Sequence, residues 1–148
     1  MIREARVEDI SSSRITKRHG RIYVVTRFYP RYMKKNLIDG YISDLAPSKE
    51  LLAEFKEREK TLDDHDAAFE AIHYEKKFDL SVEGLARLSE IAEESRHHTV
   101  YLVCHCAIGQ YCHREILMIL AEDLFGAKIA KLSHSYETFR SRLHEFRR

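Results

Sequence analysis

Residues 98–121 read HTVYLVCHCAIGQYCHREILMILA, and this stretch decides the fold class of the chain. Its first apolar run, at 99–103, is short and β-branched, which is typical of a buried strand. Its second apolar run, at 116–121, continues far enough for a buried helix. The stretch therefore predicts a strand, a loop and the start of a helix. In α/β folds, ligands bind at such points because the carboxyl ends of strands meet helix N-termini there.

A second strand is predicted at residues 21–27, which read RIYVVTR and follow the turn candidate His19-Gly20. Residues 14–17 are expected to pair with it as a hairpin. Each of the two strong strands is followed by predicted helices, which indicates right-handed parallel crossovers. We therefore expect one small α/β domain over residues 1–148. Its mostly parallel sheet would hold roughly three to five strands flanked by helices.

The helices are predicted from polar caps that precede apolar stripes. The expected N-caps are Asn36, Ser48, Thr61 or Asp63, Ser81 and Ser135. The helix after Asn36 would extend through residues 37–45, with its apolar side chains on one face. Gly126 is expected to end the buried helix in a left-handed conformation. Residues 128–132 are a candidate for a further short strand.

Composition restricts the class of protein. The chain has 148 residues, of which 44% are hydrophobic and 33% are charged, as in folded globular proteins. The formal net charge of +1 provides no global field for nucleic acid or a membrane surface. The chain begins without an apolar signal segment and has no apolar run of membrane-spanning length. Three clustered cysteines are a poor disulfide framework, so we expect reduced thiols and a cytoplasmic location.

All three cysteines lie between residues 104 and 112. Alternation along a strand places Cys104 and Cys106 on one face and His105 on the other. If Cys112 begins the helix, the positive end of the helix dipole and Arg114 would lower its thiol pKa. A pKa below about 7.5 is expected if Cys112 opens to a pocket. Burial against apolar side chains would instead raise the pKa.

Three kinds of site fit this cluster, and the first is an anion site. Free backbone N–H groups at a helix start, together with His113 and Arg114, can hold a phosphate or carboxylate. The segment from His105 to Gly109 resembles the phosphate loop of cysteine phosphatases. That loop needs an arginine after five intervening residues, where this chain has Cys112. Arg114 comes two residues later, so the sequence excludes a standard phosphatase loop.

The other two kinds of site use the sulfurs directly. Cys104, Cys106 and Cys112, with His105 or His113, could supply four soft ligands to zinc. The paired Cys-x-x-Cys knuckles of structural zinc sites are absent, so we expect no tightly bound zinc and no other cofactor. Thiol redox chemistry between Cys106 and Cys112 is the third possibility, since a short loop could bring them together. Cys104 alone is also explained as a small buried hydrophobe.

A second group of basic side chains follows the first predicted strand. Residues 26–32 read TRFYPRY and include Arg27 and Arg31. If the two strands are parallel, these arginines emerge at the same sheet edge as the cysteine loop and Arg114. The convergence of Arg27 and Arg114 there would form an anion pocket. The alternative is that Arg27 pairs with an acid such as Asp44 and only holds its loop.

These motifs carry a family resemblance. The segment from Thr26 to Arg31, the later Lys34-Lys35, the step from Asp44 to Ser48, and Cys112-His113-Arg114 resemble a bacterial and archaeal family, domain of unknown function 488 (DUF488). The resemblance extends over about residues 21–125. It differs at Tyr32, where a glycine is usual, and in the additional Cys104 and Cys106. It implies a small α/β domain with Rossmann-like layering and does not specify a reaction.

We therefore predict a pocket for a small anionic ligand, such as a nucleotide or another phosphorylated metabolite. Its predicted binding residues are Arg27, Arg31, His113 and Arg114, and the candidate reactive groups are Cys106 and Cys112. The alternative is a non-enzymatic module that binds a metal through the Cys/His cluster. Such a module could instead bind nucleic acid through the arginines of the C-terminal segment. No membrane partner is expected.

Overall fold

Strand β4 (Val100–Cys104) occupies an inner position of a four-stranded sheet in the computed structural model, which describes residues 1–147. Its neighbours are β1 (Ile2–Arg6) and β2 (Arg21–Val24), and β3 (Gly40–Tyr41) lies beyond β2. The strand order is β1-β4-β2-β3, and all three pairings are parallel. The fold is therefore α/β and Rossmann-like, and the predicted parallel sheet and both strong strands are confirmed.

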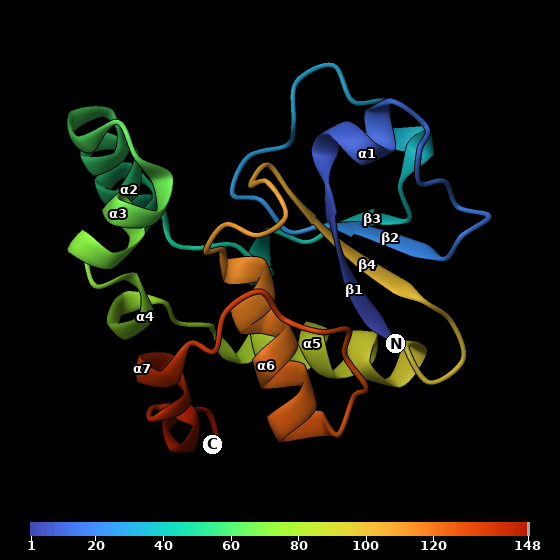
Figure 1. Ribbon diagram of the computed structural model, residues 1–148. Coiled ribbons are helices and arrows are strands. Elements are labelled where there is room, and N and C mark those ends of the chain that lie inside the picture. The colour runs from blue at the N-terminus through green and yellow to red at the C-terminus, as the bar shows by residue number, and fades with distance from the viewer. Residues whose placement is uncertain (148) are drawn as a thin grey trace.

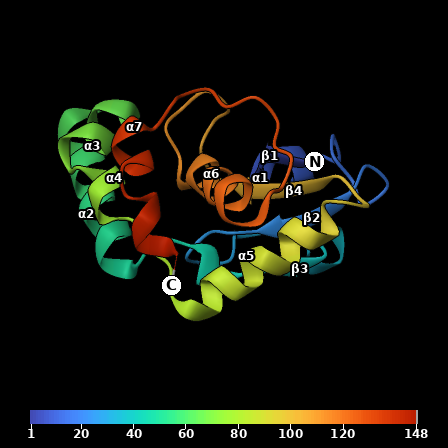
Figure 2. The same cartoon turned by 90° about the horizontal axis from the view of Figure 1, so that it is seen from below.

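Alternation along the strands divides the core between the two faces of the sheet. Leu102 and Val100 pack with α5 (Val82–Glu94) and α6 (His113–Phe125), whereas Val103 packs with α1 (Val7–Ser11) on the other face. Figures 1 and 2 show α5 and α6 on one side of the sheet and α1 on the opposite side. Cys104 has the same parity as Leu102, so its side chain points toward α6.

Three helices lie outside the sheet, beyond the carboxyl ends of its strands. They are α2 (Lys49–Leu62), α3 (His65–Ala71) and α4 (Tyr74–Lys77), drawn in green in Figure 1. The short α7 (Glu137–Arg140) packs against α4. The carboxyl ends of β2 and β4 therefore face these helices. In the sequence, α2, α3 and α4 lie between the two strands.

Several predicted helix ends are confirmed by their hydrogen bonds. The Ser48 Oγ accepts the Leu51 N–H at 3.1 Å, and the Ser81 Oγ accepts the Gly84 N–H at 3.0 Å. Gly126 ends α6 with φ of 69°, a left-handed conformation that glycine adopts without a Cβ penalty.

The helix predicted over residues 37–45 is wrong. The segment forms a 3₁₀ turn at Lys35–Leu37, the strand β3 and a second 3₁₀ turn at Ser43–Leu45. The Asp39 carboxylate accepts the Ile22 N–H at 2.8 Å, and the Asp39 N–H donates to the Ile22 carbonyl at 2.8 Å. Pairing with β2 therefore replaces the local helical hydrogen bonds, and Gly40 weakens the helical alternative further.

Other local predictions are also corrected. Residues 14–17 form no hairpin, because both neighbours of β2 are parallel strands. The third helix begins after Asp64, which caps it, and α7 begins after Tyr136 rather than Ser135. Residues 128–132 contribute one isolated bridge, between Ile2 and Ile129. The edge strand β1 was missed because only Ile2 and Ala5 of its five residues are buried hydrophobics. No helix within residues 1–147 is long and apolar enough to span a membrane.

Candidate functional site

A cavity of about 520 Å³ lies at the carboxyl edge of the sheet, facing α2 and α3. Three parts of the chain form its wall. The loop after β2 contributes residues 26–28, and the loop after β4 contributes the cysteine cluster. The outer helices contribute Leu52, Phe55, Lys56, Glu59, His65, Phe69 and Tyr74. The cavity thus brings together the loop after β2 and the cysteine loop, which the sequence analysis identified. Its remaining wall, from the outer helices, was not predicted.

The three cysteine sulfurs converge in this wall. The Sγ atoms of Cys104 and Cys106 are 4.0 Å apart, and all three Sγ atoms lie within 4.8 Å of one another. Cys104 and Cys112 are buried, Cys106 is partly exposed, and none is in a disulfide. The predicted shared face of Cys104 and Cys106 is confirmed, and His105 is exposed, as the alternation requires.

His65 is a site residue that sequence reasoning missed. Its Nε2 lies 3.3 Å from the Cys106 Sγ, although the two residues are 41 positions apart. Its Nδ1 lies 2.9 Å from the Asp66 Oδ1, and the same oxygen accepts the Tyr111 N–H at 3.0 Å. Asp66 therefore orients the imidazole and joins α3 to the cysteine loop. No local pattern in the sequence pairs residues 65 and 106.

His113 is also brought to the cluster. Its Nδ1 lies 3.8 Å from the Cys112 Sγ, and its Nε2 lies 2.8 Å from the Val25 carbonyl oxygen. Because a carbonyl only accepts, Nε2 carries a hydrogen and Nδ1 faces the sulfurs. Burial lowers the pKa of His113, but the charge of Cys104 and the hydrogen bonds with Cys104 and Cys112 together outweigh burial and raise that pKa to about 10.

The lowered thiol pKa belongs to Cys104 rather than to Cys112. Hydrogen bonds from the Cys106 and Cys112 thiols and the positive charge of His113 lower the pKa of Cys104, against the effect of burial. Burial raises the pKa of Cys112, and its hydrogen bond with Cys104 adds to that rise. Cys112 does begin α6, as predicted, but desolvation there exceeds the effect of the helix dipole. The hydrogen bond with Cys104 also raises the pKa of Cys106.

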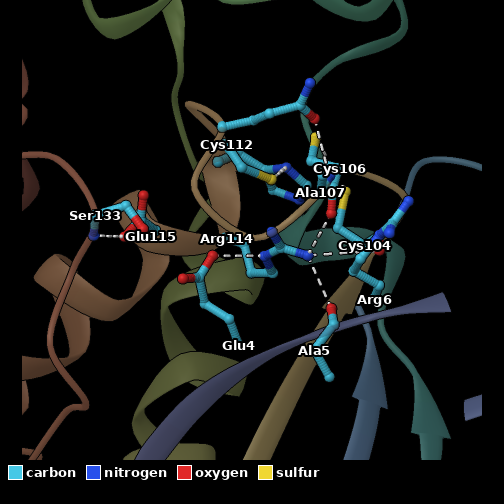
Figure 3. A network of polar contacts seen from close by, with 12 residues as sticks. Glu4, Ala5, Arg6, Cys104, Cys106, Ala107, Cys112, Arg114, Glu115 and Ser133 are labelled. Carbon is cyan, nitrogen blue, oxygen red and sulfur yellow. Dashed lines mark hydrogen bonds and ion pairs between the residues drawn. The ribbon is translucent and has the colours of Figure 1, made fainter. Parts of the chain in front are cut away.

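Arg114 is fully buried and does not line the cavity. Its Nε donates to the Glu4 carboxylate at 2.8 Å. Its Nη1 donates to the carbonyls of Ala5 at 2.8 Å and Cys106 at 3.2 Å, and Figure 3 shows the guanidinium between β1 and the cysteine loop. Arg114 therefore holds the loop to the sheet and does not share a pocket with Arg27.

Arg27 does line the cavity, next to residues of α2. Its Nε donates to the Pro47 carbonyl at 2.9 Å, and its Nη2 donates to the Ser43 carbonyl at 3.1 Å. Within residues 1–147 it forms no ion pair, so the alternative of a pair with Asp44 is not found. Arg31 is exposed and is not part of the cavity wall.

The start of α6 is held from its other side by Tyr136. The Tyr136 hydroxyl donates to the Glu115 carboxylate at 2.7 Å and accepts the Cys112 N–H at 3.0 Å. The other Glu115 oxygen accepts the Ser133 N–H at 2.5 Å, a contact drawn in Figure 3. These bonds satisfy a free N–H group at the helix start and keep Cys112 in place.

Comparison with known families identifies one match. The model of DUF488-N3a, described as the active DUF488-N3 subclade, matches residues 5–124, which is most of the chain. The match includes both cavity loops and the outer helices between them. No curated protein and no solved structure matches the chain.

Proposed function

The chain belongs to the DUF488 family, and we propose that its cavity binds a small anionic substrate with the cysteine cluster as the reaction centre. One observation carries this proposal. Arg27 lines the cavity with a partly buried guanidinium that has only backbone carbonyls as partners. Within residues 1–147 no carboxylate pairs with this cation, and a bound anion would supply such a partner.

The two carbonyl bonds also orient Arg27. They occupy Nε and Nη2, and Nη1 makes no hydrogen bond within residues 1–147. Lys56 adds a second cation to the wall, and Glu59 is the single carboxylate in it. The charge balance of the cavity therefore favours an anion, although the net charge of the whole chain is only +1.

The remaining wall suits the body of the substrate. A cavity of about 520 Å³ is within the range of small-molecule sites. The Phe69 ring stacks on Tyr74 and Tyr111 with centroid distances of 4.3 and 5.0 Å, so the aromatic wall is tightly packed. A planar or apolar group carrying phosphate, as in a nucleotide, fits this combination of aromatic and cationic side chains.

The three sulfurs in the wall supply nucleophiles for covalent chemistry. Cys106 and Cys112 are the candidates from the sequence, and the cavity adds Cys104. Cys106 is the least buried of the three, so it is the sulfur that a bound substrate reaches first. The matching subclade is described as active, which supports a catalytic role for this site.

The test is calorimetric titration of the protein with adenosine monophosphate, with adenosine as the uncharged probe. We expect the monophosphate to bind and adenosine to bind at least tenfold more weakly, since a charge-assisted bond is worth about 1.5–3 kcal/mol. Arg27→Gln should weaken monophosphate binding by a similar factor. Arg31→Gln is the matched control, because it removes a nearby exposed charge outside the cavity.

Two results would contradict the proposal. One is equal affinity for adenosine and the monophosphate, which would show that the phosphate makes no favourable contact. The other is unchanged affinity in Arg27→Gln, which would place the anion elsewhere. If neither probe binds, titration with inorganic phosphate tests the charge alone, and absence of binding there rejects the anion site.

The alternative of nucleic-acid binding through the C-terminal arginines has no support from their contacts. Arg142 donates to the carbonyls of Glu75 and Phe78, at 2.7 and 2.9 Å. Arg147 pairs with Asp123 at 2.7 Å, and Arg140 donates to the Ser135 carbonyl at 2.7 Å. These three side chains hold the C-terminal segment in place. Arg148, also part of that hypothesis, lies outside the described residues.

A further inference from the structure

The cysteine sulfurs are arranged as metal ligands are. In a tetrahedral site with metal–sulfur bonds of about 2.3 Å, neighbouring sulfurs are about 3.8 Å apart. The Cys104 and Cys106 Sγ atoms are 4.0 Å apart, and the Cys112 Sγ lies within 4.8 Å of both. Shifts of well under an ångström in rotatable side chains would bring all three to bonding distance. A disulfide bond, by contrast, measures about 2.05 Å.

A fourth potential ligand atom lies next to Cys106, one of the three sulfurs. The His65 Nε2 lies 3.3 Å from the Cys106 Sγ. The Asp66 carboxylate takes the opposite nitrogen of the ring at 2.9 Å, which leaves Nε2 with its lone pair toward the sulfurs. Metal-bound histidines characteristically donate their second ring nitrogen to a carboxylate or carbonyl in this way.

We propose that Cys104, Cys106 and Cys112 bind one thiophilic divalent cation, Zn²⁺ or a metal of the same preference, with His65 Nε2 as the fourth ligand. Sulfur-rich tetrahedral sets select such metals over Mg²⁺ and Ca²⁺. All four residues line the cavity, so the cation would face the space in which the substrate binds. In catalytic zinc sites water or substrate holds the fourth position, so His65 would have to leave the cation before a substrate oxygen could bind it.

The charge and proton balance of this site is simple. All three cysteines bind the cation as thiolates, so any thiol that is still protonated releases its proton to solvent. Three thiolates, a neutral imidazole and a divalent cation then carry a net charge of −1. Arg114 lies beneath the loop and donates to the Cys104 and Cys106 carbonyls at 3.5 and 3.2 Å (Figure 3). Its buried Nη2 has no hydrogen-bond partner, so the guanidinium retains a donor beside the cluster.

The sequence argument against zinc counted spacing along the chain and found no paired knuckles. The proposed ligands come instead from the end of β4, the loop after it, the first position before α6, and α3. Asp66 acts as a positioning residue, since it joins His65 to the loop through the Tyr111 N–H. The sequence places the three cysteines together, but no local pattern in it points to His65 as the fourth ligand.

This inference goes beyond the anion site and does not depend on it. Arg27 is held by the carbonyls of Pro47 and Ser43, and within residues 1–147 no hydrogen bond joins it to the sulfurs. Loss of the anion site would therefore leave the metal site intact. Likewise, loss of the metal site would leave the binding of adenosine monophosphate through Arg27 intact.

The test begins with reduced, metal-free protein whose three thiols have been confirmed by thiol titration. It is titrated with Co²⁺, whose thiolate complexes show charge-transfer absorption, and then with Zn²⁺ as competitor. We expect one equivalent of Co²⁺ in a tetrahedral spectrum, displaced by Zn²⁺. Cys106→Ser and Cys112→Ser should abolish stoichiometric binding. Asp66→Asn should weaken it by about 10–100-fold, as outer partners of metal-bound histidines do.

His97→Ala is the matched control, because His97 is an exposed histidine that does not line the cavity. It should bind Co²⁺ as the wild type does, and so should Arg27→Gln. Circular dichroism verifies that each variant is folded, and Cys106→Ser is the most informative because Cys106 is partly exposed. Absence of charge-transfer absorption with three free thiols would overturn the proposal. Full binding by Cys106→Ser would do the same, and full binding by His65→Ala would remove His65 from the ligand set.

Discussion

Arg27 and Arg114 follow the two strongest strands of the chain, yet the structure uses them in opposite ways. Arg27 emerges after β2 and lines the cavity, held by two backbone carbonyls with no carboxylate partner. Arg114 follows β4 within α6, is fully buried and forms an ion pair with Glu4. The partner, and not the residue type or its place after a strand, decides whether a carboxylate of the protein compensates the arginine charge.

The two arginines also hold their neighbouring loops differently. The loop after β4 is fixed from below by Arg114 and from the side by Tyr136, so its sulfurs are rigidly placed. The loop after β2 is tied down through Arg27 itself and retains an exposed Phe28. We expect changes in the first loop to affect stability and changes in the second to affect binding.

The largest effect is expected for Arg114→Met. It leaves the Glu4 carboxylate buried without a partner, so the free energy of unfolding should fall by about 3–5 kcal/mol in denaturant titration. Adding Glu4→Gln should recover part of that loss, because the second change removes the unpaired charge. Arg58→Met, at an exposed position of α2, should change stability by less than about 0.5 kcal/mol. An Arg114→Met protein as stable as the wild type would end the structural assignment.

A smaller loss is expected for Tyr136→Phe. The change removes one hydroxyl that serves both the Glu115 carboxylate and the Cys112 N–H. Leaving these buried groups without a partner should lower the free energy of unfolding by about 1–3 kcal/mol. Tyr101→Phe is the control, since the Tyr101 hydroxyl makes no hydrogen bond within residues 1–147. Equal stability of the two variants would show that Tyr136 does not hold the loop.

Arg27→Met should reduce stability by only about 1 kcal/mol, because its two hydrogen bonds are to partly exposed carbonyls and no buried charge is left behind. The measurement is the same denaturant titration as for Arg114→Met. The informative quantity is the difference between the two variants in the loss of unfolding free energy. A loss for Arg27→Met as large as that for Arg114→Met would make Arg27 structural and remove the basis for the anion site.

The smallest change is spectroscopic. The pKa of Cys104 lies below that of an ordinary thiol because Cys106, Cys112 and His113 stabilise its thiolate. In metal-free, reduced protein, thiolate ultraviolet absorbance should therefore persist as the pH falls below the ordinary thiol pKa of about 8.5. Cys104→Ser should lose this component. Cys112→Ser should keep most of it, since its hydroxyl can still donate. Identical titration curves for Cys104→Ser and the wild type would contradict the assignment.

Much of the fold is predictable because its signals are local. The β-branched run before Cys104, the caps at Ser48 and Ser81 and the stop at Gly126 each act within a few residues. Where pairing partners are distant, the local pattern misleads. Residues 37–45 carry a helical stripe, but bonds between Asp39 and Ile22 place a strand there. The edge strand β1 likewise depends on its pairing with β4.

The sequence by itself determined that the cysteine cluster stands between a buried strand and a buried helix, since apolar periodicity and alternation depend on neighbouring residues alone. It predicted that the loop after β2 opens at the same sheet edge if the two strands are parallel, and the structure shows that pairing. Only the tertiary structure decided the role of each side chain. Glu4 reaches Arg114 across 110 positions, and His65 reaches Cys106 across 41. A buried charge or sulfur takes its role from the group it contacts, and in this protein those groups come from other elements of the fold.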